Sequence, residues 1–338
     1  MTGTQAKVGR VHLEKGKKVA IQVGYARTEP GPVNLELIWS ESDRRPSPEA
    51  VSSARSADVV IAVLGITSEL EGEEMVVSSE GFRGGDRTDI VLPRGQEALL
   101  KAVRAVGRPV VLVLLNGSAL AVNWADENVP AIVEAWYPGE EGGTALADVL
   151  FGDYNPGGRL PVTFYKSVSQ LPPFDDYSMQ NRTYRYFKGE PLYPFGFGLS
   201  YTKFKYDNLK PSSKSINAGE NVTIQATVEN TGSRAGEEVV QMYVTQLGAS
   251  VPVPIRSLAG VTRISLKPGE KRAVTFVLNN RQMSVIDNQG RRVVEPGELL
   301  ITIGGKQPGF TGHADASTTS VIQGRLMVKG KPVPVPER

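Results

Sequence analysis

Cysteine is absent from the sequence, and histidine occurs only twice, as His12 and His313. The absence of cysteine excludes a disulfide framework and a thiolate metal site. Two histidines near opposite ends of the chain do not suggest a Ser-His-Asp triad or a multi-histidine metal site. We therefore predict that the protein works without a metal ion and without a cofactor.

An excess of charge of one sign and long apolar runs are also missing. The 38 basic and 36 acidic side chains leave a net charge of only +2, which gives no strong attraction to nucleic acid or to an anionic membrane. No apolar run reaches the roughly 18 residues of a membrane-spanning helix. Met1–Gln5 lack the apolar region of a signal peptide. The phosphate-binding patterns GxxxxGK and strand-linked GxGxxG are absent as well, which argues against a nucleotide-using protein.

The spacing of apolar residues changes near residue 41. Residues 1–40 alternate as strands do, and two strands alone are marginal, so this stretch looks like the end of a larger β unit. Ser47-Pro48 is a helix start, with serine as cap and proline at the first helical position. Apolar strands then alternate with amphipathic helices up to residue 205, which predicts a mostly parallel, doubly wound α/β sheet covered on both faces. The expected strands are 58–65, 110–115 and 131–137, and the expected helices are 94–106 and 142–150.

Residues 206–325 have the pattern of strands only. Apolar and polar residues alternate around Val222, Ile224 and Ala226, and proline-glycine turns such as Lys267-Pro-Gly269 recur between the strands. This pattern predicts a β-sandwich of the immunoglobulin or fibronectin type III kind. Residues 326–338 follow as a tail, and we expect its end, Lys329–Arg338, which is rich in proline and charge, to be frayed.

An acidic loop follows the expected strand at 58–65. Ligand sites in parallel sheets lie outside the carboxyl ends of the strands, so the position of this loop suggests a site. Crowded carboxylates repel each other, so one of them can have a raised pKa and act as a general acid. Calcium binding is a rival use, although the spacing is not that of an EF-hand, and a solvated surface loop is the plainest alternative. The acids are Glu69, Glu71, Glu73, Glu74, Glu80, Asp86 and Asp89.

Aromatic residues gather with glycine in two further places. Trp136 and Tyr137 end the expected strand at 131–137, where they could stack on a sugar ring or belong to the core. Residues 181–187 and 193–202 form an aromatic connector that is either an interdomain seam or a sugar platform. The Asn116-Gly-Ser118 turn is weak evidence for a serine nucleophile, because no histidine is available to activate it.

Three long motifs occur in order along the chain. They are WYPGEEGGTALADVLFGDYNPGGRLPVTF at 136–164, RTYRYF at 182–187 and PLYPFGFGLSYTKF at 191–204. These motifs resemble the C-terminal half of glycoside hydrolase family 3, in its bacterial β-xylosidase and β-glucosidase branch. The resemblance identifies residues 41–205 as the α/β sandwich domain of the family and residues 206–325 as its fibronectin type III-like domain. Residues 1–40 resemble the end of a protective-antigen-type carbohydrate-binding β-domain.

The resemblance also implies a reaction. Family members are retaining β-glycosidases that remove terminal sugars, and two carboxylates flank the bond that is cleaved. In the family the nucleophilic aspartate lies on a TIM barrel, and this sequence contains no such (β/α)₈ pattern. The expected partners are a β-linked oligosaccharide or aryl glycoside and the TIM-barrel domain of a parent enzyme, which we expect to be periplasmic or secreted. We expect the isolated chain to be inactive.

The acid/base glutamate of the family comes from the acidic loop. Its short Glu-X-Glu or Gly-Glu-Gly segment matches Leu70–Glu74 here, and Glu73 fits best. Glu71 is the second choice, Glu74 the third, and Glu80 is weaker because it lies farther from the strand. The resemblance further assigns Glu71, Asp86 and Arg87 to substrate binding, with the Asp-Arg pair positioning the loop. The alternative function is a non-catalytic carbohydrate-binding or scaffold module.

Overall fold

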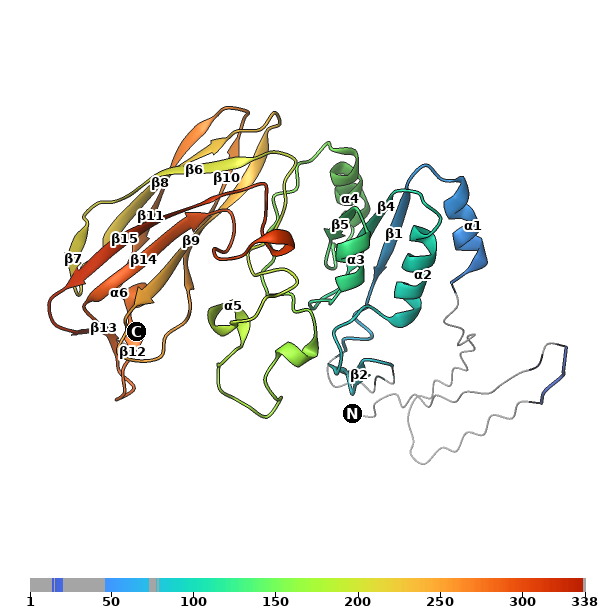
Figure 1. The fold of residues 1–338 in the computed structure, drawn as a ribbon, viewed down its shortest axis with the longest axis horizontal. Coiled ribbons are helices and arrows are strands. Elements are labelled where there is room, and N and C mark those ends of the chain that lie inside the picture. Colours follow the sequence, from blue (N-terminus) through green and yellow to red (C-terminus); the bar gives the residue numbers. More distant parts are fainter. Residues whose placement is uncertain (1–13, 15, 21–45, 73–76, 78, 337–338) are drawn as a thin grey trace. The chain divides into compact units, whose positions relative to one another are not determined.

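A computed structural model describes residues 14, 16–20, 46–72, 77 and 79–336 of the chain (Figure 1). The strands predicted between residues 1 and 40 lie almost wholly outside the described residues. The chain divides into two compact units. The first consists of Met1–Leu115 and Val129–Glu134, and the second of Asn116–Asn128 and Ala135–Arg338.

Two helices of the first unit begin and end close to where the sequence predicts. Helix α1 (Pro48–Ser56) has Ser47 as its cap, and the Ser47 hydroxyl accepts a hydrogen bond of 3.2 Å from the Ala50 amide. Helix α2 (Arg94–Arg104) buries Leu100 and Val103. The apolar stripe of α2 therefore faces inward, as its spacing predicts.

A parallel sheet of three strands forms the centre of the first unit. The strands are β1 (Val60–Gly65), β4 (Val110–Leu115) and β5 (Ala131–Glu134), in the order β1-β4-β5. Residue Val60 pairs with Val110, and Val111 pairs with Ala131, so all three strands run in one direction. The parallel sheet is thus confirmed, and its strands end at one edge, next to the acidic loop (Figure 1).

Strand β1 differs from its expected full burial. It is an end strand of the described sheet, and Val59, Ile61 and Val63 keep 52%, 47% and 52% of their surface exposed. The sequence has a continuous apolar run here, which is typical of a strand covered on both faces. The expectation of a wholly buried strand is wrong for this face of β1, because no described element covers these three side chains.

The exposed apolar face of β1 is expected to promote self-association of the chain. The double variant Ile61→Thr/Val63→Thr is expected to lower concentration-dependent self-association of the purified chain, because it removes exposed apolar surface while threonine keeps its preference for strands. Light scattering over a concentration series measures this. Unchanged scattering would contradict the interpretation. Val113→Thr, at a wholly buried position of β4, should instead lower the midpoint of thermal unfolding.

The second unit holds four short helices ahead of a β-sandwich. The helices before the sandwich are α3 (Asn123–Asn128), α4 (Gly142–Phe151), the 3₁₀ helix η1 (Val168–Gln170) and α5 (Thr183–Tyr186). Helix α4 matches its expected range and ends at Gly152, which adopts the left-handed conformation with φ of 85°. Helix α3 has only six residues, and the sequence analysis did not predict it.

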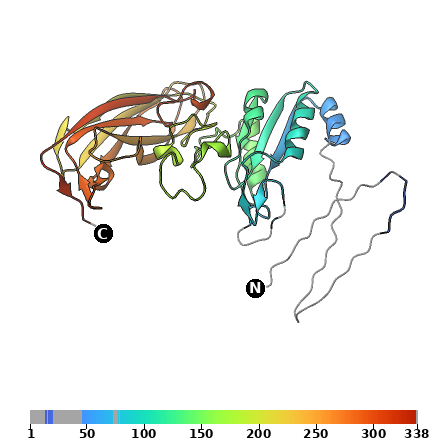
Figure 2. The same ribbon diagram turned by 60° about the horizontal axis from the view of Figure 1, so that its bottom comes forward.

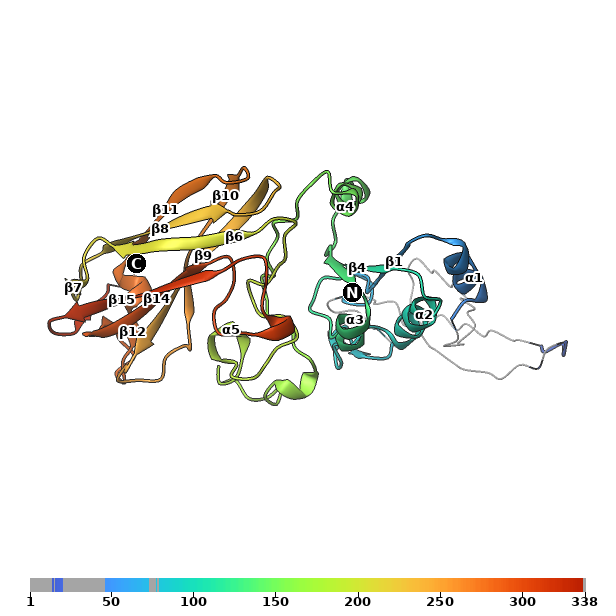
Figure 3. The ribbon, with the colours of Figure 1, turned by 45° about the horizontal axis from the view of Figure 1, so that its top comes forward.

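The β-sandwich has one sheet of five strands and one of three (Figure 3). The larger sheet has the order β10-β9-β14-β15-β7 and the smaller one the order β11-β8-β6. Alternate residues point into the shared core, where Ile224, Met242 and Ile303 are fully buried. The strands are β6 (Phe204–Pro211), β7 (Ser215–Asn217), β8 (Val222–Asn230), β9 (Gly236–Leu247), β10 (Ser257–Leu266), β11 (Lys271–Leu278), β14 (Gly297–Gly304) and β15 (Val321–Lys329).

The end of the chain is more ordered than a frayed tail. Strand β15 continues to Lys329 and buries Leu326 and Val328. Its last residues pair with β7, and β16 (Val333–Pro334) pairs with β13 (Arg292–Val294). Two apolar residues at a spacing of two hold this segment in the sheet despite its charges. The remaining elements are α6 (Asn280–Met283), β12 (Val285–Ile286) and the 3₁₀ helix η2 (Gly312–Ala314).

Candidate active site

Gly65 sets the direction in which the acidic loop leaves the sheet. Its φ of 148° is one that side chains rarely adopt, and a Cβ atom at this position would lie 1.8 Å from the carbonyl oxygen of Leu115. The next amide, of Ile66, donates to the same Leu115 oxygen at 2.9 Å. The backbones of β1 and β4 thus approach too closely for any residue but glycine.

Gln96 of helix α2 holds the start of the loop. Its side-chain oxygen accepts from the Gly65 amide at 2.7 Å, and its side-chain nitrogen donates to the Gly65 carbonyl at 2.8 Å. The amide side chain therefore satisfies both backbone groups of the last residue of β1. The sequence analysis missed this residue. The only signal was a glutamine in the first turn of the helix that follows the loop.

The first limb of the loop is a single helical turn. The Thr67 carbonyl accepts from the amides of Leu70 and Glu71 at 3.0 and 3.2 Å, and the Thr67 hydroxyl donates to Glu69. Glu71 is half-buried at the end of this turn, and Gly72 after it is buried. Glu71 therefore lies six residues beyond Gly65, the last residue of β1.

The second limb is a tight hairpin. Strands β2 (Phe82–Arg83) and β3 (Asp86–Arg87) pair antiparallel, and Gly84 and Gly85 connect them with φ values of 62° and 95°. Two positive φ values in a two-residue turn require glycine or a residue like it. The glycines of the acidic loop therefore serve a turn at this point.

Arg87 fixes the base of this hairpin. Its Nε donates to the Asp89 carbonyl at 3.0 Å, and its guanidinium lies 5.6 Å from the centre of the Phe82 ring. Asp86 is exposed on the neighbouring position of the strand. Adjacent strand residues point to opposite faces, so the two members of the Asp-Arg motif are presented to different sides of the hairpin.

Several acids of the loop hold its own structure. The Asp89 carboxylate accepts from the amides of Ile90 and Val91, and Glu80 forms an ion pair of 2.9 Å with Arg94 at the start of α2. These contacts tie the hairpin limb to the helix that also carries Gln96. The described residues contain no group of three His, Asp or Glu side chains that could hold a metal ion.

The predicted site residues divide between described and undescribed parts. Glu71, Asp86 and Arg87 lie in the described limbs of one loop, whereas Glu73 and Glu74 lie outside the described residues. The structure therefore places the two ends of the segment that carries Glu73. It begins after Gly72, and Val77 and Ser79 lie before the hairpin.

The aromatic connector packs on the β-sandwich of the same unit. The Tyr184 ring stacks on Phe195 with 4.2 Å between centroids and meets Tyr243 of β9 edge-on. The side chain of Gln241 donates to the carbonyl of Gly196. These contacts place Tyr184 and Phe195 of the connector 181–187 and 193–202 against the β-sandwich within one unit. Trp136 likewise packs edge-on against the buried Phe164, at 6.0 Å, as a core residue would.

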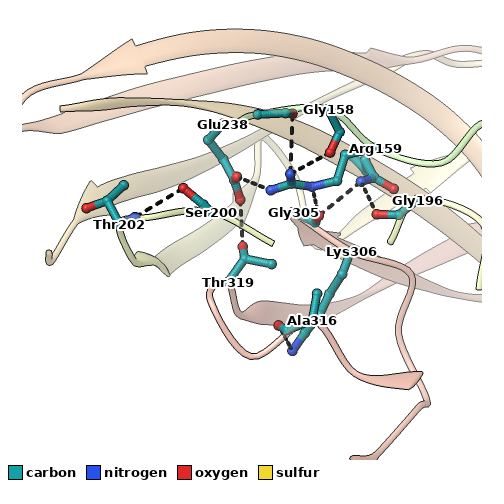
Figure 4. A network of polar contacts seen from close by, with 12 residues as sticks. Gly158, Arg159, Gly196, Ser200, Thr202, Glu238, Gly305, Lys306, Ala316 and Thr319 are labelled. Carbon is teal, nitrogen blue, oxygen red and sulfur yellow. Dashed lines mark hydrogen bonds and ion pairs between the residues drawn. The ribbon is translucent and has the colours of Figure 1, made fainter. Parts of the chain in front are cut away.

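A buried ion pair lies beside the same connector (Figure 4). Arg159 donates to Glu238 at 2.6 Å and to the carbonyl of Gly305 at 2.8 Å, and the two charged side chains are 5% and 0% exposed. The hydroxyls of Tyr206 and Thr319 donate to the other Glu238 oxygen. Burial raises the pKa of Glu238, although Arg159 and both hydroxyls act to lower it.

Comparison with known families gives two matches. The family model described as "Glycosyl hydrolase family 3 C-terminal domain" matches residues 2–201. The model described as "Fibronectin type III-like domain" matches residues 238–307, within the β-sandwich. Both agree with the order of the two folds along the chain.

Relatives and solved structures point the same way. A xylan 1,4-β-xylosidase of Xylanibacter ruminicola is 42% identical over 86% of this chain, and a periplasmic β-glucosidase of Salmonella typhimurium is 41% identical over 76%. The structure of a β-glucosidase from Erythrobacter marinus matches 83% of the chain with a TM-score of 0.70 and 36% identity. The chain spans only 33%, 34% and 36% of these three proteins, about a third of their length.

Proposed function

Because the chain belongs to glycoside hydrolase family 3, we propose that it supplies the general acid/base glutamate of a retaining, exo-acting β-glycosidase. The nucleophilic aspartate then lies on a TIM-barrel domain outside these 338 residues. The substrate class is the terminal β-linked sugar of plant-type oligosaccharides, of the kind that β-xylosidases and β-glucosidases remove. One relative is named a periplasmic enzyme, and we place the parent of this chain in the periplasm or outside the cell.

The observation that carries this proposal is the anchoring of the acidic loop. Gly65 and Gln96 fix its first end at the carboxyl edge of a parallel sheet, and the Glu80–Arg94 pair fixes its second end to the same helix. A loop held at both ends can present a carboxylate to a sugar bound by another domain. Catalytic groups on loops supported by a rigid scaffold are common for this reason.

Among the glutamates of the loop, Glu73 is the residue to which we assign the acid/base role. Glu80 is committed to its ion pair with Arg94, and Glu71 ends the helical turn that starts at Thr67. Glu73 follows the buried Gly72 and lies between the two anchored limbs. Glu71 remains the second choice and takes part in substrate binding with Asp86 and Arg87.

The reaction that we propose has two steps. The acid form of Glu73 gives its proton to the leaving-group oxygen while the aspartate of the barrel forms a bond to the sugar. The glutamate, now ionised, then takes a proton from the water that hydrolyses this intermediate. One carboxyl group therefore acts first as acid and then as base, and of the two reacting carboxyl groups this chain contributes only that one.

An activity assay of the isolated chain tests whether the second carboxylate lies outside it. Purified residues 1–338 are expected to hydrolyse p-nitrophenyl β-xyloside and β-glucoside no faster than buffer, because only one of the two carboxylates is present. The enzyme encoded by the longer reading frame upstream of Met1 should hydrolyse at least one of them. Turnover by the isolated chain would contradict the proposal. An upstream region without a barrel would favour a non-catalytic sugar-binding module.

A further inference from the structure

A loop of the second unit presents two aromatic rings to solvent. It connects η1 to α5 and projects away from the β-sandwich (Figures 1 and 2). Phe174 and Tyr177 in this loop keep 94% and 93% of their surface exposed, more than any other large apolar side chain that the structure describes. Exposed aromatic rings this close together are unusual on a protein surface and mark binding sites more often than other surface residues do.

The backbone behind these rings is held in place by Arg182. Its guanidinium donates to the carbonyls of Pro173 and Asp176 at 2.9 and 2.6 Å, and its Nε donates to Ser178 at 3.2 Å. The Asp176 amide also donates to the Pro173 carbonyl, which closes a turn around Phe174. The rings are therefore mounted on an ordered backbone, and little further order has to be imposed when a ligand binds.

Two carboxylates stand between the rings. Asp175 and Asp176 separate Phe174 from Tyr177 in the sequence, and Asp176 accepts a hydrogen bond of 2.9 Å from the Ser178 amide. That amide lowers the pKa of Asp176, so this carboxylate is ionised at neutral pH. The loop thus combines apolar ring faces with anionic hydrogen-bond acceptors.

We propose that residues 173–178 form a carbohydrate-binding platform, which takes a β-linked xylan or glucan chain. The apolar face of each pyranose stacks on a ring, and its hydroxyls donate to the carboxylates. Phe174 and Tyr177 are three residues apart, so the distance between their Cα atoms is at most about 11 Å. One short oligosaccharide can therefore reach both rings. The choice of these polysaccharides rests on the proposed function.

A sugar suits this loop better than an apolar protein surface does. Covering the rings with an apolar partner would also remove water from two carboxylates without replacing their hydrogen bonds, which is costly. A sugar covers the rings and supplies hydroxyl donors in the same contact. No cationic partner is needed to balance the charge, because the carboxylates stay partly solvated at an open site.

Affinity electrophoresis of the full 338-residue chain tests the platform. Native gels containing soluble xylan or laminarin should retard the wild-type chain in at least one case. The double variant Phe174→Ala/Tyr177→Ala should weaken the apparent affinity by about tenfold or more, because both stacked rings are lost. Phe151→Ala is the matched control, since Phe151 is 81% exposed but lies at the end of α4, and it should migrate as wild type.

A second variant separates ring orientation from ring identity. Arg182→Gln keeps both rings but removes the charged group that holds the turn, and it should weaken retardation less than the double variant does. Equal retardation of wild type and double variant would overturn the proposal, and so would the absence of retardation in both polysaccharides. A dimer of the wild type that the double variant loses, without a sugar effect, would identify a second copy as the occupant instead.

The outcome is independent of the acid/base assignment. The platform requires only binding, and none of its residues belongs to the acidic loop. Retardation without any turnover by the longer enzyme would sustain the platform and reject the proposed reaction. Turnover by the longer enzyme with no retardation of this chain would sustain the proposed reaction and reject the platform.

Discussion

Replacement of Glu73 by alanine in the longer enzyme is expected to slow the hydrolysis of substrates with poor leaving groups by about 10²–10⁴-fold. Such substrates need a proton on the departing oxygen, and Glu73 is the residue to which we assign the delivery of this proton. Activated aryl glycosides need little protonation, so their first step should be affected much less. Steady-state kinetics with a series of aryl glycosides of increasing leaving-group pKa measures the difference.

Azide supplies the second half of this test. A small anion can attack the glycosyl intermediate without base assistance, so azide should restore turnover of activated substrates by the Glu73→Ala enzyme. Glu97→Ala is the matched control, because the Glu97 carboxylate pairs with Lys101 within α2 and not with the loop, and it should keep the leaving-group dependence of the wild type. Equal loss for good and poor leaving groups with no azide rescue would reject Glu73 and direct the same test to Glu71.

Replacement of Arg159 by methionine is expected to give the largest loss of stability. Arg159 and Glu238 are almost wholly buried, and the variant leaves the Glu238 carboxylate without its counter-charge. Breaking such a pair costs about 3–5 kcal/mol. Chemical denaturation of the chain measures the loss. Arg325→Met removes a more exposed ion pair with Glu298 and should cost no more than about 1 kcal/mol.

The pH dependence of this loss has a definite sign. Burial raises the pKa of Glu238, and the raised pKa should rise further when Arg159 is gone. A carboxyl group with a raised folded-state pKa binds a proton more readily in the folded chain than in the unfolded chain, so stability falls as the pH increases through that pKa. The Arg159→Met variant should therefore be closest to wild type in acid and weakest at neutral pH. A loss that does not change with pH would contradict this account.

Local signals predicted much of the fold. Ser47-Pro48 marks the start of α1, and the run from Val110 to Leu115 is a strand as expected. The alternation of Val222, Ile224 and Ala226 reappears as the buried face of β8. Each of these three features depends on residues within one turn or one strand, so a short stretch of sequence is enough to predict it.

Features that depend on distant residues were not predictable in the same way. The exposure of Ile61 and Val63 depends on the place of β1 in the strand order, and the run of apolar residues looks the same for an inner and an outer strand. The clamp on Gly65 depends on Gln96, 31 residues further along the chain. Val333 and Pro334 of β16 pair with β13, and the charged and proline-rich composition of this segment does not reveal the pairing.

The position of the acidic loop in the sheet was predictable, whereas the contacts within the loop were not. The loop leaves the carboxyl end of a parallel strand, and Arg87 contacts Asp89 and Phe82 in its hairpin. The contacts of Glu80 and Asp89 could not be read from the sequence, because seven acids within one loop are equivalent until their partners are known. That Glu73 is the acid that contacts the substrate stays a prediction.

Trapping of the glycosyl-enzyme intermediate tests the central claim most directly. The longer enzyme that carries this chain is treated with a 2-deoxy-2-fluoro β-glycoside, whose intermediate is hydrolysed slowly, and the labelled peptide is identified by mass spectrometry. The account predicts a label on an aspartate outside residues 1–338, because this chain provides the acid/base and not the nucleophile. A label on any glutamate of the loop between residues 67 and 89 would contradict it.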